Sequence, residues 1–181
     1  MISGPSGAGK GTIIKRVLAS LGDIVVSVSA TTRASRPGEV DGVDYHFMTR
    51  DAFERAIAEG MFLEWVEYGG NLYGTLRSEV EHKLAAGYDV ILEIELRGAR
   101  AVRGAVPEAE LIFIAPPSLA ELDERLRGRA TESDEAIATR LRIAQEEVAA
   151  APEFDHVVVN DDAERTAREV AEIIAQRRTA R

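Results

Sequence analysis

The stretch Gly4-Pro5-Ser6-Gly7-Ala8-Gly9-Lys10-Gly11-Thr12 decides the fold of this chain. It matches most of the phosphate-loop pattern G-x-x-x-x-G-K-[ST]. Such a loop turns backbone N–H groups toward phosphate oxygens, and the helix after it adds free N–H groups and a positive dipole end. We expect Lys10 to reach the β- and γ-phosphates of a nucleoside triphosphate. A Rossmann dinucleotide site is excluded, because the glycine spacing differs and a lysine stands at the start of the helix.

The loop departs from the pattern at one position. The residue after the lysine, usually a hydroxyl that binds magnesium, is Gly11, and the hydroxyl follows at Thr12. Many nucleoside monophosphate kinases have this Gly-Lys-Gly-Thr order, so the shift favours that class. Thr12 is then expected to contact a phosphate rather than the metal. The alternative is a chance glycine-rich turn, which the strand-like residues before it and the amphipathic helix after it disfavour.

Apolar runs alternate with helical patterns along the rest of the chain. The runs are apolar at successive positions, which is typical of parallel strands buried on both faces. This alternation predicts an α/β fold, a three-layer sandwich with a parallel sheet core. Only three residues precede Gly4, so we predict a short first strand. The other expected strands are residues 24–28, 90–94, 111–115 and 157–159, and the expected helices are residues 10–21, 97–105, 119–126, 133–150 and 163–178.

Residues 31–87 have a different pattern, which predicts an inserted α+β subdomain. Arginine- and glycine-rich loops come first, and short strands near 45–48 and 62–68 follow. Two short helices are expected near 51–59 and 78–86, with Thr49 as the N-cap of the first and Gly87 at the end of the second. The chain is therefore expected to be one domain, 1–181, with a core of residues 1–30 and 88–181.

Composition limits the possible functions. The chain has 181 residues, 45% of them hydrophobic, and contains no cysteine, so disulfides and thiolate metal sites are excluded. The net charge of −9 disfavours non-specific binding to nucleic acid, although a local cationic pocket can still bind a small anion. No apolar run is long enough for a membrane helix, and no leader pattern is present, so we expect a cytoplasmic protein.

A second cationic group follows the second expected strand. Arg33 and Arg36 are three residues apart beside the hydroxyls of Ser29, Thr31 and Thr32. Two arginines in this setting suit a phosphate monoester. Taken alone, an Arg-x-x-Arg pair is more often a solvated turn.

This segment and those after it resemble the guanylate kinase family from Ile2 to about Ile174. Several independent motifs occur in the family's order, which makes the resemblance specific. The matching segments are Ser27 to Glu39, Asp41-Gly42-Val43-Asp44-Tyr45-His46-Phe47, Phe62-Leu63-Glu64-Trp65, Asn71-Leu72-Tyr73-Gly74-Thr75, Glu93-Ile94-Glu95 with Gly98, Ile114-Ala115-Pro116-Pro117-Ser118, Arg125-Leu126-Arg127-Gly128-Arg129 and Val159-Asn160-Asp161-Asp162.

The resemblance implies a GMP site within residues 31–87. Arg33, Arg36, Tyr45 and Tyr73 would hold the GMP phosphate, with Ser29 nearby, and Glu64, Thr75 and Glu95 would read guanine. Guanine presents N1–H and N2–H₂ donors that a carboxylate accepts, and its O6 needs a donor such as a hydroxyl. Adenine has the opposite pattern, so this pocket should reject AMP. Outside this context, an exposed strand carboxylate would be the preferred interpretation of Glu64.

The resemblance also implies the donor side and the metal. The family usually has Asp-Ile-Asp where this chain has Glu93-Ile94-Glu95, so each carboxylate is one methylene longer. Alternation along a strand places both glutamates on one face, with Glu93 near the waters of Mg²⁺. A mobile lid would cover about residues 127–139. Arg129 would stack on adenine, Arg140 would reach the phosphates of ATP, and Asn160 would contact adenine. For Arg125, Arg127 and Arg142, pairing with Glu121, Glu124 and Glu146 is preferred over catalysis.

The implied activity is phosphoryl transfer from MgATP to GMP or dGMP. Lys10, Arg33, Arg36, Arg140 and Mg²⁺ would face the developing charge. Two alternatives stay open, namely a non-catalytic guanylate-kinase-like interaction module and a kinase of another nucleoside monophosphate. Lys10, Arg129 and Arg140 disfavour the first, because such a module would lack them. We expect no nucleic acid or membrane partner and a monomer or homodimer.

Overall fold

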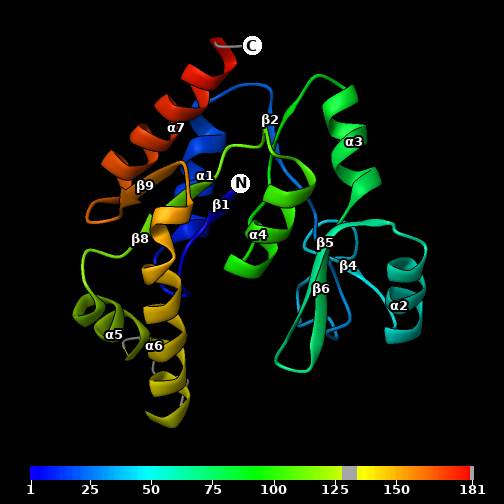
Figure 1. Ribbon diagram of the computed structural model, residues 1–181, viewed down its shortest axis with the longest axis horizontal. Helices are drawn as coiled ribbons and strands as arrows, with labels where there is room; N and C mark the ends of the chain where they lie inside the picture. Colours follow the sequence, from blue (N-terminus) through cyan, green and yellow to red (C-terminus); the bar gives the residue numbers. More distant parts are fainter. Residues whose placement is uncertain (128–133, 180–181) are drawn as a thin grey trace. The chain divides into compact units, whose positions relative to one another are not determined.

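The computed structural model describes residues 1–127 and 134–179, which form two compact units (Figure 1). The phosphate-loop unit consists of Met1–Gly22, Glu93–Leu96 and Glu110–Arg181, and the mixed-sheet unit of Asp23–Leu92 and Arg97–Ala109. Packing defines these units, and the functional subdomain boundaries expected from the sequence stay a prediction. Among the described residues, no helix combines the length and the apolar character needed to cross a membrane.

The phosphate-loop unit contains a three-stranded parallel sheet. Its strands are β1 (Ile2–Ser3), β8 (Ile112–Ala115) and β9 (His156–Val159), in the order β1-β8-β9. Ile2 pairs with Ile112, and Ile112 pairs with His156. All four residues of the central strand β8 are buried, as its unbroken apolar run predicts. The two-residue β1 confirms the prediction of a short first strand.

Helices of this unit pack in two pairs. Helix α1 (Lys10–Ser20) contacts α7 (Ala163–Thr179), and α5 (Leu119–Arg127) contacts α6 (Asp134–Ala149), as Figure 1 shows. A 3₁₀ turn, Ala151–Glu153, follows α6. The second pair is held by a small apolar cluster of Leu122, Leu126, Ile137 and Ala144.

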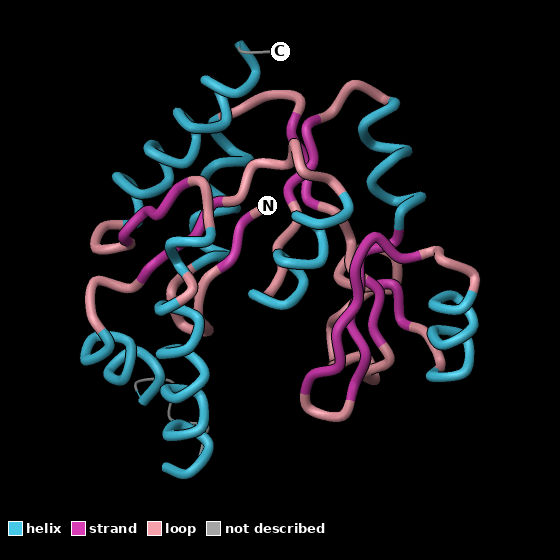
Figure 2. Tube along the Cα trace, in the orientation of Figure 1, coloured by secondary structure: helices cyan, strands magenta, loops and turns pink. Residues whose placement is uncertain are grey.

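The mixed-sheet unit contains two sheets, whose strands are coloured magenta in Figure 2. In the first, β2 (Ile24–Val26) pairs in parallel with β7 (Asp89–Ile91). The second has the order β4-β3-β6-β5, from β3 (Ala30–Thr31), β4 (His46–Phe47), β5 (Phe62–Tyr68) and β6 (Asn71–Leu76). Its helices are α2 (Arg50–Ala58), α3 (Arg77–Ala85) and most of α4 (Leu96–Ala105).

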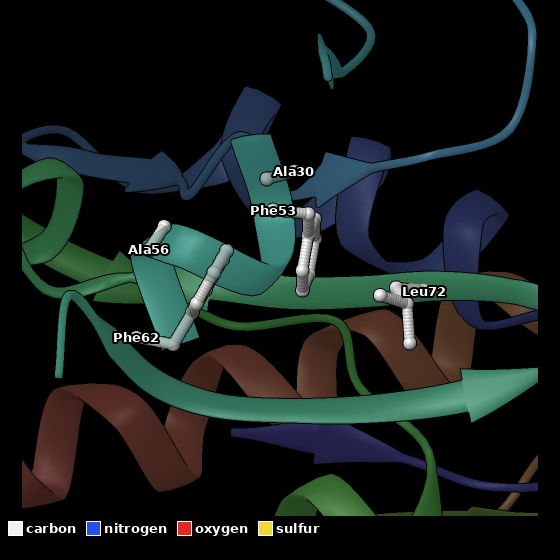
Figure 3. Packing of buried hydrophobic residues seen from close by; sticks show 5 residues of the cluster. All are labelled: Ala30, Phe53, Ala56, Phe62 and Leu72. Carbon is white, nitrogen blue, oxygen red and sulfur yellow. The ribbon is translucent and has the colours of Figure 1, made fainter. Parts of the chain in front are cut away.

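An apolar cluster of Ala30, Phe53, Ala56, Phe62 and Leu72 packs α2 onto the four-stranded sheet (Figure 3). The rings of Phe53 and Phe62 stack with their centroids 4.2 Å apart and their planes 21° apart. Truncation of a buried phenylalanine costs roughly 3–5 kcal/mol. This cluster therefore fixes the sheet that carries β5 and β6.

The helix boundaries agree with those expected from the sequence within two residues, because their caps are local. The Thr49 hydroxyl accepts a hydrogen bond from Ala52 N–H at 3.2 Å, which confirms the predicted N-cap of α2. After α3, Gly87 has φ 88°, and Tyr88 N–H donates to Lys83 O at 3.1 Å. This positive φ favours glycine, so the predicted end of α3 is confirmed.

The strands differ more from expectation. The predicted α/β fold with parallel strands and a mixed-sheet subdomain is confirmed, but the parallel strands divide between two sheets. The expected strand 90–94 pairs only as far as Ile91, and Glu93 makes an isolated parallel bridge with Ile2. Leu92 and Ile94 are buried, whereas Glu93 and Glu95 are exposed. The chain stays extended with its two carboxylates on one face, as predicted, without continuing the β7 ladder.

Candidate active site

The phosphate loop folds as a tight turn at the N-terminus of α1. Ala8 N–H donates to Pro5 O at 3.0 Å, which closes the turn. Gly9 is the N-cap of α1 with φ 92°, and its carbonyl accepts from Thr12 N–H at 3.0 Å and Ile13 N–H at 3.1 Å. The N–H groups that precede these in the helix, those of Lys10 and Gly11, have no carbonyl of a preceding turn to bind, so they are available to an anion. Ser6, Gly11 and Thr12 are exposed on this turn.

Lys10 folds back over the loop. Its ammonium donates to Gly4 O at 2.5 Å and to Pro5 O at 3.3 Å. Burial lowers the pKa of Lys10, and the charges of Glu93, Glu147 and Glu95 oppose that change. The phosphate-loop unit therefore presents a cation and nearby carboxylates at the loop, which suits a metal-bound triphosphate.

Glu147 of α6 belongs to this group of charges, although the sequence motifs do not single it out. Its residue is only 9% exposed. Burial raises the pKa of Glu147, the charge of Lys10 lowers it, and Glu95 raises it further. The available signal is its helical position, because Glu147 lies three residues after buried Ala144 and four before buried Ala151.

The other residues expected on the donor side are only partly placed. Arg140 is a partly buried residue of α6, and Asn160 follows β9 with its side chain buried. Arg129 and the rest of residues 128–133 of the expected lid lie outside the described residues, whereas residues 134–139 belong to α6. Arg125 pairs with Glu121 at 3.3 Å and Arg142 with Glu146 at 2.7 Å, as predicted, whereas Arg127 pairs with Asp123 at 2.8 Å rather than with Glu124.

In the mixed-sheet unit, Arg33 is held by a carboxylate. Its guanidinium makes a bidentate pair with Glu39, at 2.7 Å and 3.0 Å. Glu39 also accepts from the backbone N–H of Arg36 at 2.6 Å. The Arg33 hydrogen bond and then that N–H hold the pKa of Glu39 below its usual range. Glu39 thus fastens the loop that carries both arginines, a role that spacing alone does not reveal.

Aromatic residues surround the same guanidinium. The Arg33 Cζ lies 5.3 Å from the Tyr45 ring centroid and 5.8 Å from that of Phe47. The rings of Tyr45 and Tyr73 lie 6.3 Å apart. The structure therefore brings Arg33, Tyr45 and Tyr73 together. Arg36 is exposed, and Ser29 O accepts the His46 N–H at 2.9 Å.

Glu64 and Thr75 form a buried polar pair in the same unit. They are opposite each other on β5 and β6, and the Thr75 hydroxyl donates to Glu64 Oε1 at 2.7 Å. Glu64 is 6% exposed and Thr75 is 1% exposed. Glutamate is rarely buried unless it has a partner or a function. Glu64 is therefore not an exposed strand carboxylate.

A phosphate loop on a parallel sheet, with a separate mixed-sheet unit that carries an arginine–tyrosine cluster and a buried carboxylate, defines a phosphate-loop kinase of small nucleotides. The family profile described as guanylate kinase matches residues 1–177. The guanylate kinase of Rubrobacter xylanophilus is 58% identical over 174 residues, which cover 96% of this chain and 91% of the relative. The chain belongs to the guanylate kinase family.

Further relatives agree with this assignment. The guanylate kinase of Synechococcus sp. strain CC9311 is 53% identical over 164 residues, which cover 91% of this chain and 86% of that protein. The crystal structure of guanylate kinase from Anaplasma phagocytophilum is similar with a TM-score of 0.77 and 35% identity, and the match covers 97% of this chain and 82% of that one.

Proposed function

We propose that this protein transfers the γ-phosphoryl group of MgATP to a phosphate oxygen of GMP or dGMP, forming ADP and GDP or dGDP. Its family membership makes it a guanylate kinase, a nucleoside monophosphate kinase that binds ATP and GMP. The observation that carries the choice of base is the buried Glu64–Thr75 pair. A desolvated carboxylate that accepts two donors distinguishes guanine from adenine.

On the donor side, the loop is proposed to bind the triphosphate through its N–H groups. Lys10 would exchange the carbonyls of Gly4 and Pro5 for the β- and γ-phosphates, because charged oxygens are better acceptors for an ammonium. Thr12 is exposed beside the loop and would contact a phosphate. Arg140, and Arg129 beyond the described residues, would stabilise the phosphates and the adenine.

On the acceptor side, Arg33, Arg36, Tyr45 and Tyr73 are proposed to hold the GMP phosphate. Arg33 is oriented by Glu39 and by the aromatic rings, so little ordering is needed when the phosphate arrives. Glu64 would accept the N1–H and N2–H₂ of guanine. The Thr75 hydroxyl now donates to Glu64, so it would have to turn to donate to O6. Glu95 would also contact guanine, as the resemblance to the family implies.

The residues present fit a magnesium ion that is held mainly by phosphates and water. Among the described residues, no three histidine or acidic side chains gather as a protein cage for a metal. Mg²⁺ prefers to keep several waters, and exposed Glu93 on the extended segment can hold one of them. When bound, the ion neutralises charge on the β- and γ-phosphates. Lys10 would share that task, because phosphoryl transfer needs positioning and charge stabilisation more than a general base.

The first test is a coupled assay with GMP, dGMP, AMP, UMP and CMP. We expect activity with GMP and dGMP only. Preference for a base without guanine's donor edge would support a kinase of another monophosphate, and no turnover with any of them would support a non-catalytic interaction module. We also propose that the protein acts in the cytoplasm, as a monomer or a homodimer.

The second test is Lys10→Ala. This variant should keep the fold, because Lys10 bonds only carbonyls of its own loop in the described contacts. We expect kcat to fall by about 10²–10³ while the KM for GMP changes little. Exposed Lys15, on the same helix, supplies the control as Lys15→Ala. Turnover of Lys10→Ala at the wild-type rate would contradict the assignment.

A further inference from the structure

Asn160 is held at three of its polar groups within the phosphate-loop unit. Its backbone N–H donates to Ala115 O at 2.8 Å, at the end of β8. Its carbonyl accepts from Arg125 Nη2 of α5 at 3.1 Å. Its side-chain Nδ2 donates to Ala8 O of the phosphate loop at 2.7 Å, and the residue is 7% exposed. Asn160 thus links the sheet and α5 to the phosphate loop.

The loop is shaped around this amide. A Cβ placed on Gly9 would lie 2.5 Å from Asn160 Nδ2, which is closer than such atoms approach. Gly9 also has φ 92°, a conformation that favours glycine. The Asn160 amide therefore fills the space next to Gly9. The amide is held in place by this close approach and by its hydrogen bond to Ala8 O.

The hydrogen bond to Ala8 determines how one peptide group faces. In a planar trans peptide, the C=O and the following N–H point in opposite directions. Since Ala8 O points at Asn160, the N–H of Gly9 is turned away from Asn160. Rotation of this peptide would turn the Ala8 carbonyl, whose oxygen repels an anion, to the side that the Gly9 N–H now faces.

We propose that Asn160 is a positioning residue that fixes the Ala8–Gly9 peptide in the orientation that binds phosphate. This inference rests on the proposed use of the loop as the triphosphate site. It differs from the adenine contact expected for Asn160 from the sequence. An adenine contact would affect only adenine nucleotides, whereas a fixed peptide favours any triphosphate to the same degree.

The test is calorimetric titration of the whole protein with ATP, CTP and inorganic tripolyphosphate, each with excess Mg²⁺. Asn160→Ala should weaken all three by the same factor, about tenfold, because one buried hydrogen bond to the loop is lost. Asn160→Asp keeps the shape but replaces the donor by an acceptor, so all three should weaken at least as much. The Asn160→Asp variant also keeps the test possible if the cavity left by alanine unfolds the protein.

Asn71→Ala is the matched control. The Asn71 amide also donates to a backbone carbonyl, Gly69 O at 3.3 Å, but in the mixed-sheet unit. The affinities of the Asn71→Ala variant for ATP, CTP and tripolyphosphate should equal those of the wild type. A loss confined to ATP, or no loss in either Asn160 variant, would overturn the proposal. The Lys10→Ala variant tests the proposed triphosphate site separately from the role of Asn160. Unchanged tripolyphosphate binding in this variant would refute the loop as the triphosphate site.

Discussion

Glu64 is the residue whose substitution tests base recognition most directly. Glu64→Gln keeps the size of the side chain and an oxygen for the Thr75 hydroxyl, so this variant should fold. The NH₂ group of the new amide would face the donor edge of guanine without an acceptor between them. An unsatisfied buried donor costs about 1–3 kcal/mol, so we expect the KM for GMP to rise by about 10–100-fold. Steady-state kinetics with GMP as the varied substrate measures this change.

The control for that variant lies on the same strand. Glu67 of β5 is exposed and pairs with Arg50 at 3.4 Å, a contact worth little in water. Glu67→Gln should therefore leave the KM for GMP within about twofold of the wild type. A Glu64→Gln enzyme with an unchanged KM, or a Glu67→Gln enzyme with an equal rise, would show that Glu64 does not read the base.

At this scale, the sequence indicates the chemistry of the residues better than their partners. Motifs single out Arg33 and Glu64, because residue type and order are visible along the chain. The burial of Glu64 and its bond from Thr75 depend on the register between β5 and β6. The pairing of Arg33 with Glu39 depends on how a loop closes. No local preference encodes either contact.

At the scale of elements, helices are easier to predict than strands. Helix periodicity and caps are local, so Thr49 correctly marks the start of α2 and Gly87 the end of α3. The sequence does not predict strands β3 and β6, since short strands are stabilised by the neighbours they pair with. For the same reason, the division of the parallel strands between two sheets is not visible in the sequence.

Helix α6 carries a carboxylate whose burial should make stability depend on pH. Burial raises the pKa of Glu147 above its unfolded value, so the fold favours the neutral form. This contribution to stability is fully present below the unfolded pKa and is lost as pH rises through the folded pKa. A glutamine side chain at this position would imitate the neutral form at every pH. We expect Glu147→Gln to be more stable than wild type at pH 8, with a smaller difference at pH 4.5, in urea unfolding.

Glu146→Gln is the control on the same helix. Glu146 is 65% exposed and pairs with Arg142 at 2.7 Å, so its substitution should show no such gain at pH 8. If Glu147→Gln instead loses stability at pH 8 relative to pH 4.5, attraction to Lys10 outweighs the cost of burial. That result would contradict the direction assigned to the Glu147 pKa.

At the scale of the whole molecule, each of the two units has a cationic group and an apolar cluster of its own. The chain carries a net charge of −9, yet Lys10 and Arg33 provide cationic groups in separate units. Each unit also has an apolar cluster of its own, around Leu122 in one and Phe53 in the other. The sequence predicts the inserted subdomain from its change of pattern. It does not predict the packing boundary, which depends on contacts between distant segments.

Two units that each contain an apolar cluster of their own should respond separately to the two substrates. A ligand at 100 times its Kd stabilises the state that binds it by about 2.7 kcal/mol, which slows exchange through local opening by about 100-fold. We expect GMP alone to slow amide hydrogen exchange in residues 29–36 and 62–76. A non-hydrolysable ATP analogue should slow exchange in residues 4–12 and leave the first set less affected. Mass-spectrometric hydrogen exchange resolves both sets of peptides.

The two site variants make this prediction reciprocal. Lys10→Ala should lose the protection given by the ATP analogue and keep that given by GMP, because Lys10 lies in the phosphate-loop unit. Glu64→Gln should do the opposite at a GMP concentration that saturates only the wild type. Protection of residues 4–12 by GMP without protection of residues 62–76 would place the GMP site in the phosphate-loop unit instead of the mixed-sheet unit. The assignment of GMP to the mixed-sheet unit would then be abandoned.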